Sequence, residues 1–217
     1  MFEKHLAWGV LFRLFHWAFA LSIAFLVVTG LYIHWPWGNS ILEGSASFPM
    51  ANMRYYHFIA GYVFIGAVAV RCYLWFFGNR QEKLWNAAPI TPGNIKNLVS
   101  TLGYYLYFTD RHEHRLGHNA LAGTIYILTI IAAFFQMLSG LCLLFPESLF
   151  WQKWGLAVFG TQQQARFIHY LIMWYFLLFV FIHLYILIWN DIRAPEGLIS
   201  SIFNGRKFFP KGAFKKD

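Results

Sequence analysis

The stretch RFIHYLIMWYFLLFVFIHLYILIW, Arg166–Trp189, is long and apolar enough to cross a lipid bilayer as one helix. It nevertheless keeps two histidines, His169 and His183, fourteen residues apart. Fourteen helical steps place both rings on one face, separated by about 21 Å along the helix axis. Ionisable side chains at such depths are costly and usually functional. The stretch therefore predicts a membrane-spanning helix that carries two functional imidazoles at two depths.

The composition excludes a soluble domain. Of the 217 residues, 59% are hydrophobic, 21% are aromatic and only 12% are charged, against about 25% charged in soluble proteins. Four segments have the length and hydropathy of membrane-spanning helices: residues 11–33, 55–77, 120–145 and 167–189. We therefore predict an all-α integral membrane protein, a four-transmembrane-helix bundle that forms a single domain over residues 1–217.

The positive charges predict the orientation. With the N-terminus inside, all of the 17 Lys and Arg residues lie on or near the inner side except Arg54, Lys153 and Arg166. This asymmetry predicts both termini in the cytoplasm. We read the net charge of +8 as this topology signal and not as nucleic-acid binding, because no soluble domain carries it.

Four histidines fall at two matched depths. His57, near the outer end of the second segment, is level with His169, and His16, near the inner end of the first, is level with His183. Two histidines on facing helices at one level are the arrangement of a bis-histidine haem in a helix bundle. The spacing predicts two haems, and the lack of a C-x-x-C-H motif predicts that they are bound non-covalently.

Arginines and glycines accompany these histidines. The pattern R-x-x-H occurs at Arg13, Arg54 and Arg166, one turn from a histidine and closer to the headgroups. A guanidinium there could pair with haem propionates, and the candidates are Arg13, Arg54, Arg71 and Arg166. Alternatively, these arginines anchor the helix ends at the membrane interface. This alternative explains Arg13 better than it explains Arg54 and Arg166, which lie on the outer side. Gly30 and Gly61 could leave room for the macrocycle, although close helix packing explains either glycine equally well.

Other histidines compete as ligands or serve a different site. His34 shares the face of His16 but lies close to Pro36, where we expect the helix to end, and His118 could reach the inner level. His118 and Asn119 could instead hydrogen-bond a quinone carbonyl, with Asn119 as a helix N-cap being the alternative. Tyr185 is a weaker quinone candidate, because it points elsewhere on its helix.

The chain resembles a known family, the b-type cytochrome subunits of membrane-bound nickel–iron uptake hydrogenases. The similar motifs cover most of the chain: RLFHW (13–17), MRYYHFIAGYVF (53–64), RCYLWFFGNR (71–80), GHNALAG (117–123) and ARFIHYLIMWYFLLFVFIHLY (165–185). The four-helix, four-histidine plan is shared with the gamma subunit of formate dehydrogenase.

The resemblance implies a function. Such subunits anchor a periplasmic hydrogenase in the bacterial inner membrane, bind two b haems, take electrons from the iron–sulfur small subunit beside the nickel–iron large subunit, and reduce menaquinone or ubiquinone. It also implies that His57 and His169 hold the outer haem, that His16 and His183 hold the inner one, and that Asn119 lies near the quinone. The chain has no cysteine set for splitting hydrogen, so whether it counts as an enzyme depends on a quinone site.

Two alternatives differ in partner or in class. A related respiratory complex, such as formate dehydrogenase or thiosulfate reductase, would use the same electron-transfer chemistry. A histidine-based transporter of metal ions or protons is more distant, because the four segments contain no Asp or Glu on a path. A bare structural anchor would leave the level-matched histidines unexplained.

Overall fold

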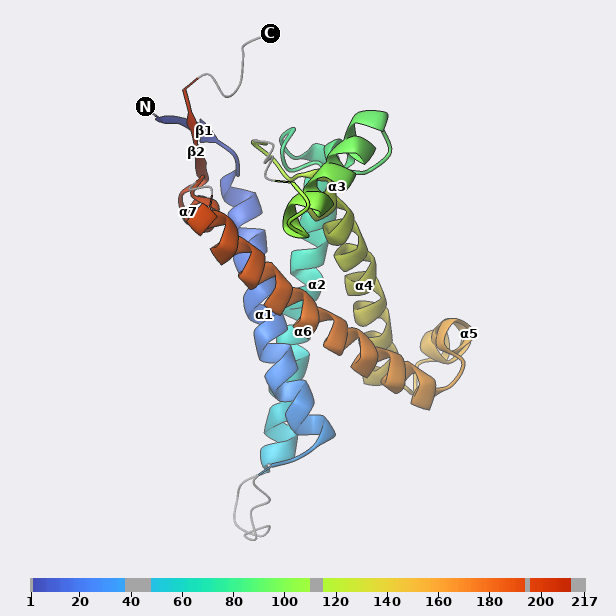
Figure 1. Ribbon diagram of the computed structural model, residues 1–217. Helices are drawn as coiled ribbons and strands as arrows, with labels where there is room; N and C mark the ends of the chain where they lie inside the picture. Colours follow the sequence, from blue (N-terminus) through green and yellow to red (C-terminus); the bar gives the residue numbers. More distant parts are fainter. Residues whose placement is uncertain (1, 38–47, 110–114, 194–195, 212–217) are drawn as a thin grey trace. The chain divides into compact units, whose positions relative to one another are not determined.

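The computed structural model describes residues 2–37, 48–109, 115–193 and 196–211, and Figure 1 traces their order along the chain. Four of its helices are long and apolar enough to cross a membrane, which confirms the predicted all-α fold with four spanning helices. They are α1 (Val10–His34), α2 (Pro49–Phe77), α4 (Ala120–Leu144) and α6 (Gln162–Arg193). The shorter elements are β1 (Phe2–Leu6), η1 (Leu84–Asn86), α3 (Pro92–Tyr105), η2 (Trp151–Gly155), α5 (Leu156–Phe159), α7 (Leu198–Asn204) and β2 (Arg206–Pro210).

Two spanning helices begin before the apolar segments that predicted them. Helix α2 starts at Pro49, and proline suits the first helical turn because its missing N–H needs no partner there. Helix α6 starts at Gln162, after a reciprocal cap in which Thr161 Oγ1 accepts from the Gln164 N–H at 3.1 Å and Gln164 Oε1 accepts from the Thr161 N–H at 2.9 Å. Polar first turns of this kind are not part of an apolar segment. The predicted segments, which were chosen by hydropathy, therefore begin several residues after the helices do.

The chain divides into two compact units, and each of the four long helices contributes to both. Unit 1 comprises residues 1–15, 70–132 and 180–217, and unit 2 comprises residues 16–69 and 133–179. Each unit is described separately below.

Unit 1 joins the two ends of the chain in a small antiparallel sheet. Strand β1 pairs with β2 in a register that runs from Phe2 opposite Pro210 to Leu6 opposite Arg206. An even number of spans returns the chain to the side on which it began, so this pairing agrees with four spans. The sequence analysis did not predict either strand.

Buried polar groups organise the rest of unit 1. The Glu82 carboxylate, 2% exposed, accepts from the Gly9 N–H at 2.8 Å and the Asn79 N–H at 2.9 Å. The Asn97 amide oxygen accepts from the Ala120 N–H at 2.9 Å and so satisfies a donor at the start of α4. Each buried acceptor thus satisfies backbone N–H groups, near the ends of the long helices, that would otherwise lack a hydrogen-bond partner.

Lys207 is a buried cation of unit 1. Its ammonium donates to the carbonyls of Arg115 at 3.3 Å and Gly117 at 3.2 Å, and it lies 5.6 Å from the centroid of the Trp8 ring. Burial lowers the pKa of Lys207 to about 8, although Glu196 and Asp191 oppose this shift.

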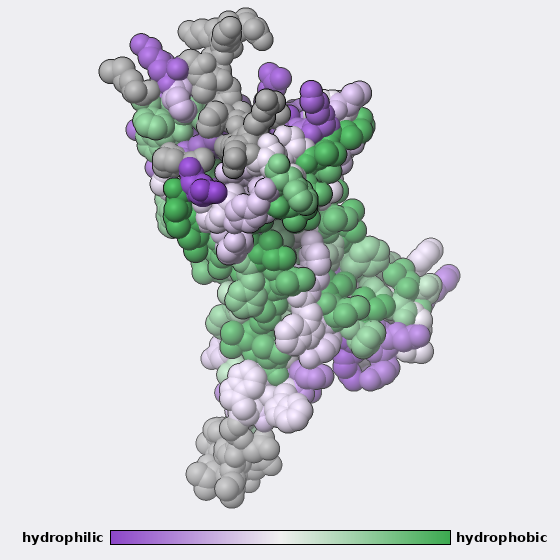
Figure 2. All heavy atoms as spheres, in the orientation of Figure 1, coloured by the Kyte–Doolittle hydropathy of each residue, from purple (hydrophilic) through white to green (hydrophobic). Residues whose placement is uncertain are grey.

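Unit 2 is held mainly by aromatic and small apolar side chains. The rings of Phe19, Phe64 and Phe176 meet at centroid distances between 5.1 and 6.2 Å. A second cluster forms around the fully buried Cys142 and Ala165, with Phe159 of α5 against them. Outside these clusters the long helices expose many large apolar side chains, among them Leu21 at 64% and Leu171 at 56%. Figure 2 shows this hydrophobic surface along the helices, as expected of a chain whose solvent there is lipid.

Candidate functional site

Two predicted ligands, His57 of α2 and His169 of α6, meet within unit 2. Their ring centroids lie 6.4 Å apart and their planes are inclined by 65°. The sequence analysis placed these histidines at one depth from their positions in two separate segments. The structure brings the same two rings together.

A hydroxyl group holds the Nδ1 atom of each ring. Thr29 Oγ1 lies 2.8 Å from His57 Nδ1, and Ser139 Oγ lies 2.9 Å from His169 Nδ1. Each hydroxyl also donates to a carbonyl of its own helix, Thr29 to Phe25 at 2.8 Å and Ser139 to Gln136 at 3.1 Å. A hydroxyl has one proton to donate; when that proton is bonded to the helix carbonyl, the hydroxyl accepts from the imidazole, and the ring then carries its proton on Nδ1.

A glycine follows each of these hydroxyl residues. A Cβ added at Gly30 would lie 3.3 Å from His57 Cε1, and one added at Gly140 would lie 3.2 Å from His169 Cε1. Both distances are shorter than ordinary van der Waals contact, so the missing side chains allow the two rings to sit close to α1 and α4. Of these glycines the sequence analysis named only Gly30.

The Nε2 atoms are the remaining ligand atoms, and the arrangement fits a haem iron. A histidine nitrogen lies about 2 Å from a bound metal such as zinc. For an iron held between two rings, this places the ring centroids about 6 Å apart. The observed 6.4 Å matches that separation, and protonation at Nδ1 leaves a lone pair on Nε2. The unit 2 histidines therefore suit axial ligation of a haem.

Gln136 contacts the same atom of one ligand. Its side-chain Nε2 lies 3.2 Å from His169 Nε2, while its Oε1 is buried without a hydrogen-bond partner among the described residues. In this orientation the amide N–H donates to the Nε2 lone pair, which is consistent with a proton on Nδ1. An iron bound to His169 Nε2 would use this lone pair and replace the hydrogen bond from Gln136.

The arginines before these two histidines remain in reach of solvent. Arg54 is exposed, and Arg166 is exposed and donates to Gln163 Oε1 at 3.3 Å. Such side chains can turn towards carboxylates without losing a buried partner. His34 is placed differently, because its ring stacks on Tyr170 at a centroid distance of 4.5 Å.

The other predicted ligands lie in different surroundings. His16, in unit 2, contacts the Trp17 ring edge-on at a centroid distance of 5.4 Å. His183, in unit 1, has its Nδ1 atom 3.5 Å from the Tyr126 hydroxyl. Tyr126 in turn packs edge-on against His118 at 4.6 Å, and His118 lies 4.7 Å from the Trp8 ring. One aromatic chain thus connects a predicted iron ligand with a predicted quinone contact.

Two further arginines were predicted to meet propionates. Arg71 is 3% exposed, lies over the rings of Phe12 and Phe15 at 5.7 and 5.9 Å, and has an Nη1 atom without a hydrogen-bond partner among the described residues. A buried guanidinium with an unused donor suits an anion. Arg13 instead donates to the Phe203 carbonyl at the end of α7.

The remaining predicted residues are placed as follows. Asn119 caps α4, because its Oδ1 accepts from the Ala122 N–H at 2.8 Å, so the alternative reading of this residue is confirmed as one of its roles. Tyr185 is 63% exposed. A Cβ at Gly61 would meet no described atom within 4 Å, which leaves open space on that side of α2.

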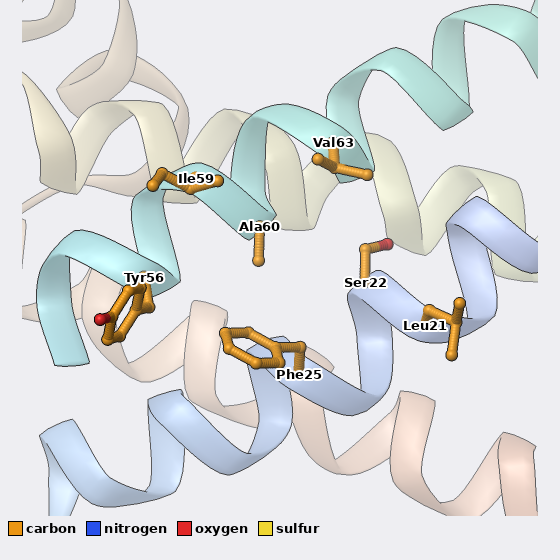
Figure 3. A pocket seen from close by; sticks show the side chains of 7 residues that line it. All are labelled: Leu21, Ser22, Phe25, Tyr56, Ile59, Ala60 and Val63. Carbon is orange, nitrogen blue, oxygen red and sulfur yellow. The ribbon is translucent and has the colours of Figure 1, made fainter.

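An apolar cleft of about 310 Å³ lies between α1 and α2 in unit 2. Its lining is shown in Figure 3: Leu21, Ser22, Phe25, Tyr56, Ile59, Ala60 and Val63. The one buried hydroxyl, that of Ser22, donates to the Phe19 carbonyl at 2.9 Å. No histidine lines the cleft, so it is separate from the histidine site.

Four residues that contact the predicted ligands were not predicted from the sequence: Thr29, Ser139, Gln136 and Tyr126. A signal for the first two exists, since a hydroxyl residue is followed by Gly and Leu in both VTGLY (28–32) and LSGLC (138–142). Nothing in a single sequence marked Gln136 or Tyr126, because their roles depend on which helices face each other.

Comparisons with known proteins identify the family of this chain. The family model described as prokaryotic cytochrome b561 matches residues 7–205. Relatives named probable Ni/Fe-hydrogenase B-type cytochrome subunit include one from Cupriavidus necator, 30% identical over 91% of this chain and 84% of its own length, and one from Azotobacter chroococcum, 32% identical over 91% and 85%. A relative from Escherichia coli K12, named probable Ni/Fe-hydrogenase 1 B-type cytochrome subunit, is 27% identical over 89% of this chain and 86% of its own length.

These names confirm the resemblance seen in the sequence motifs. A chain with four spanning helices and a paired-histidine site, matched over nearly its whole length, belongs to the prokaryotic cytochrome b561 family.

Proposed function

We propose that this chain is the dihaem membrane subunit of a nickel–iron hydrogenase. In this role it takes electrons from the iron–sulfur small subunit, which sits with the nickel–iron large subunit on the periplasmic side, and passes them to a quinone. The observation that carries the proposal is the pair His57 and His169, whose ring centroids lie 6.4 Å apart and whose Nδ1 atoms each contact a hydroxyl. The names of the relatives supply the hydrogenase partner.

When bound, each b haem supplies an iron that gains and loses one electron. In the proposed role, His57 and His169 would hold the haem nearer the periplasm, and the 6.4 Å between their ring centroids supports this assignment. For the second haem the proposal rests on sequence spacing, which assigns His16 and His183. Arg54 and Arg166 lie one turn from the first ligand pair and would pair with the propionates of a haem held there.

We propose that the quinone site lies at the cytoplasmic end of the electron path. We place the cytoplasm on the side of both termini, because nearly all Lys and Arg residues fall there, and the membrane is then the bacterial inner membrane. His118 is the preferred contact, since Tyr126 connects it with His183, and Asn119 is the second. Tyr185 is the weaker candidate, because its side chain is 63% exposed.

This arrangement stores energy. Moving one electron inward against the membrane potential costs about 2.3 kcal/mol per 100 mV. If the quinone takes its protons from the cytoplasm while hydrogen is oxidised outside, that work adds to the proton-motive force. His118 is the group on this chain that could hand a proton to the quinone.

One spectrum tests the proposal. The dithionite-reduced minus air-oxidised absorbance of the purified protein, with a haem count, should show low-spin b-type haem at two per chain. A colourless, correctly assembled protein would contradict it. Co-purification with a nickel protein would support the hydrogenase partner, and co-purification with a formate or thiosulfate enzyme would identify a related respiratory complex instead.

The transporter alternative gains no support from the geometry. Within the part of the chain that the structure describes, no three His, Cys, Asp or Glu side chains converge to hold a metal ion. The paired histidines have hydroxyl partners at Nδ1, an arrangement that suits permanent ligation better than transient binding.

A further inference from the structure

The same two-residue step occurs beside both histidines of unit 2. In α1 it is Thr29–Gly30, which contacts His57 of α2, and in α4 it is Ser139–Gly140, which contacts His169 of α6. Each step lies on the long helix that precedes the histidine in the chain. The arrangement is therefore duplicated: a hydroxyl residue and a glycine on one helix meet a histidine on the next spanning helix.

The two members of each step act on different parts of the ring. The hydroxyl contacts Nδ1, at 2.8 Å for Thr29 and 2.9 Å for Ser139. The glycine leaves space beside Cε1, at 3.3 Å for Gly30 and 3.2 Å for Gly140. One member therefore sets the tautomer, and the other sets how closely the ring approaches the neighbouring helix.

The helix backbone gives the hydroxyls their direction. The Thr29 and Ser139 protons are bound to carbonyls of their own helices, so only their lone pairs face the histidines. Ser22 shows that this backbone bond forms without any histidine, because its hydroxyl donates to the Phe19 carbonyl at 2.9 Å. Thr29 and Ser139 differ from Ser22 in that the oxygen of each hydroxyl also contacts a histidine Nδ1 atom.

We infer that Thr29–Gly30 and Ser139–Gly140 form a duplicated positioning element that holds His57 and His169 with Nδ1 protonated and Nε2 turned to one haem iron. This inference rests on the proposed function. A hydrogen bond from Nδ1–H to a hydroxyl increases the basicity of Nε2 and so favours the ferric over the ferrous iron. The element thereby lowers the midpoint potential of this haem and slows its loss.

The test uses isosteric and conservative variants of the full chain in its complex. Thr29→Val and Ser139→Ala remove the hydroxyls, whereas Thr29→Ser and Ser139→Thr keep them. Ser22→Ala is the matched control, since it removes a buried hydroxyl of α1 that donates to the Phe19 carbonyl. The readouts are haem count, the midpoint potential of each haem, and the rate of haem transfer to apomyoglobin.

We expect Thr29→Val and Ser139→Ala to raise one midpoint potential and leave the other unchanged. Haem loss should accelerate about 10- to 100-fold, the usual effect of removing such a partner. Thr29→Ser and Ser139→Thr should restore both readouts. Potentials and loss rates equal to those of Ser22→Ala would overturn the inference, while a wild-type protein without haem would overturn the proposed function instead.

Glycine variants test the second member without weakening the helix. Gly30→Ala and Gly140→Ala raise helix propensity by about 1 kcal/mol, so the variants should fold. Their new methyl groups must displace the rings and change the low-spin electron paramagnetic resonance spectrum of one haem. Gly66→Ala is the control, because a Cβ there meets no described atom within 4 Å. Spectra that match this control would contradict the proposed role of the glycines.

Discussion

The two units surround their histidines in different ways. In unit 2 the Nδ1 atoms of His57 and His169 meet aliphatic hydroxyls at 2.8 and 2.9 Å, and those hydroxyls are themselves tied to helix carbonyls. In unit 1 the Nδ1 atom of His183 has a phenol at 3.5 Å, the outer limit of a hydrogen bond. The first environment places a hydroxyl beside each Nδ1 atom, while the second places an aromatic chain beside the ring.

The interiors differ as well. Unit 1 buries charged groups, with Glu82 at 2% and Lys207 at 4% exposure, whereas unit 2 buries aromatic rings and small residues. Buried charges hold loops and strands by directed hydrogen bonds. Ring packing instead tolerates the flat, apolar surface of a macrocycle. We therefore expect ligand changes to act on haem in unit 2 and charge changes to act on stability in unit 1.

The largest effect should follow from removing a ligand. His169→Ala should reduce the haem count from two to one per chain, because one axial bond cannot replace two at this site. Pyridine haemochrome analysis gives the count. His34→Ala is the control, since its ring stacks on Tyr170 and should leave both haems in place. Equal haem content in the two variants would refute the pairing of His57 with His169.

Removing the Glu82 carboxylate should destabilise unit 1 by about 3 kcal/mol. Glu82→Ala leaves the N–H groups of Gly9 and Asn79 without their acceptor, and a hydrogen bond to a charged group contributes about 1.5–3 kcal/mol. Tryptophan fluorescence during thermal unfolding in detergent measures the change. The exposed Glu147 provides the control variant Glu147→Ala, and an equal melting temperature would contradict the structural role of Glu82.

Lys207 predicts a pH dependence of stability with a definite sign. Because its pKa is lowered to about 8 in the folded protein, the unfolded chain binds more protons between pH 8 and 10.5. The free energy of unfolding should therefore rise with pH through this window, by about 1 kcal/mol per pH unit from this residue. The quantity to measure is the difference between wild type and Lys207→Met, which should grow in favour of the wild type as pH increases. A difference that stays constant with pH would show that Lys207 is not titrating there.

The smallest effect should come from the phenol of Tyr126. Tyr126→Phe removes a contact of 3.5 Å from His183, so the midpoint potential of that haem should shift less than Thr29→Val shifts the other. Potentiometric titration of both variants compares the two environments directly. A larger shift in Tyr126→Phe would reverse our ranking of the two contacts.

Much of the fold followed from hydropathy. The four spans were predicted to within a few residues at most ends, since about 20 apolar residues are needed to cross a bilayer. The polar first turn of α6 and the pairing of β1 with β2 were missed. Capping groups lie outside an apolar window, and strands from opposite ends of the chain have no local signal that they will pair.

The sequence by itself determined the number of spans and the shared depth of His57 and His169, because hydropathy and helical periodicity are properties of neighbouring residues. Only the tertiary structure decided which hydroxyl meets which ring. Thr29 and His57 are 28 residues apart, and Ser139 and His169 are 30 apart. Contacts over such separations depend on the rotation and crossing of whole helices, which the packing of many side chains sets together.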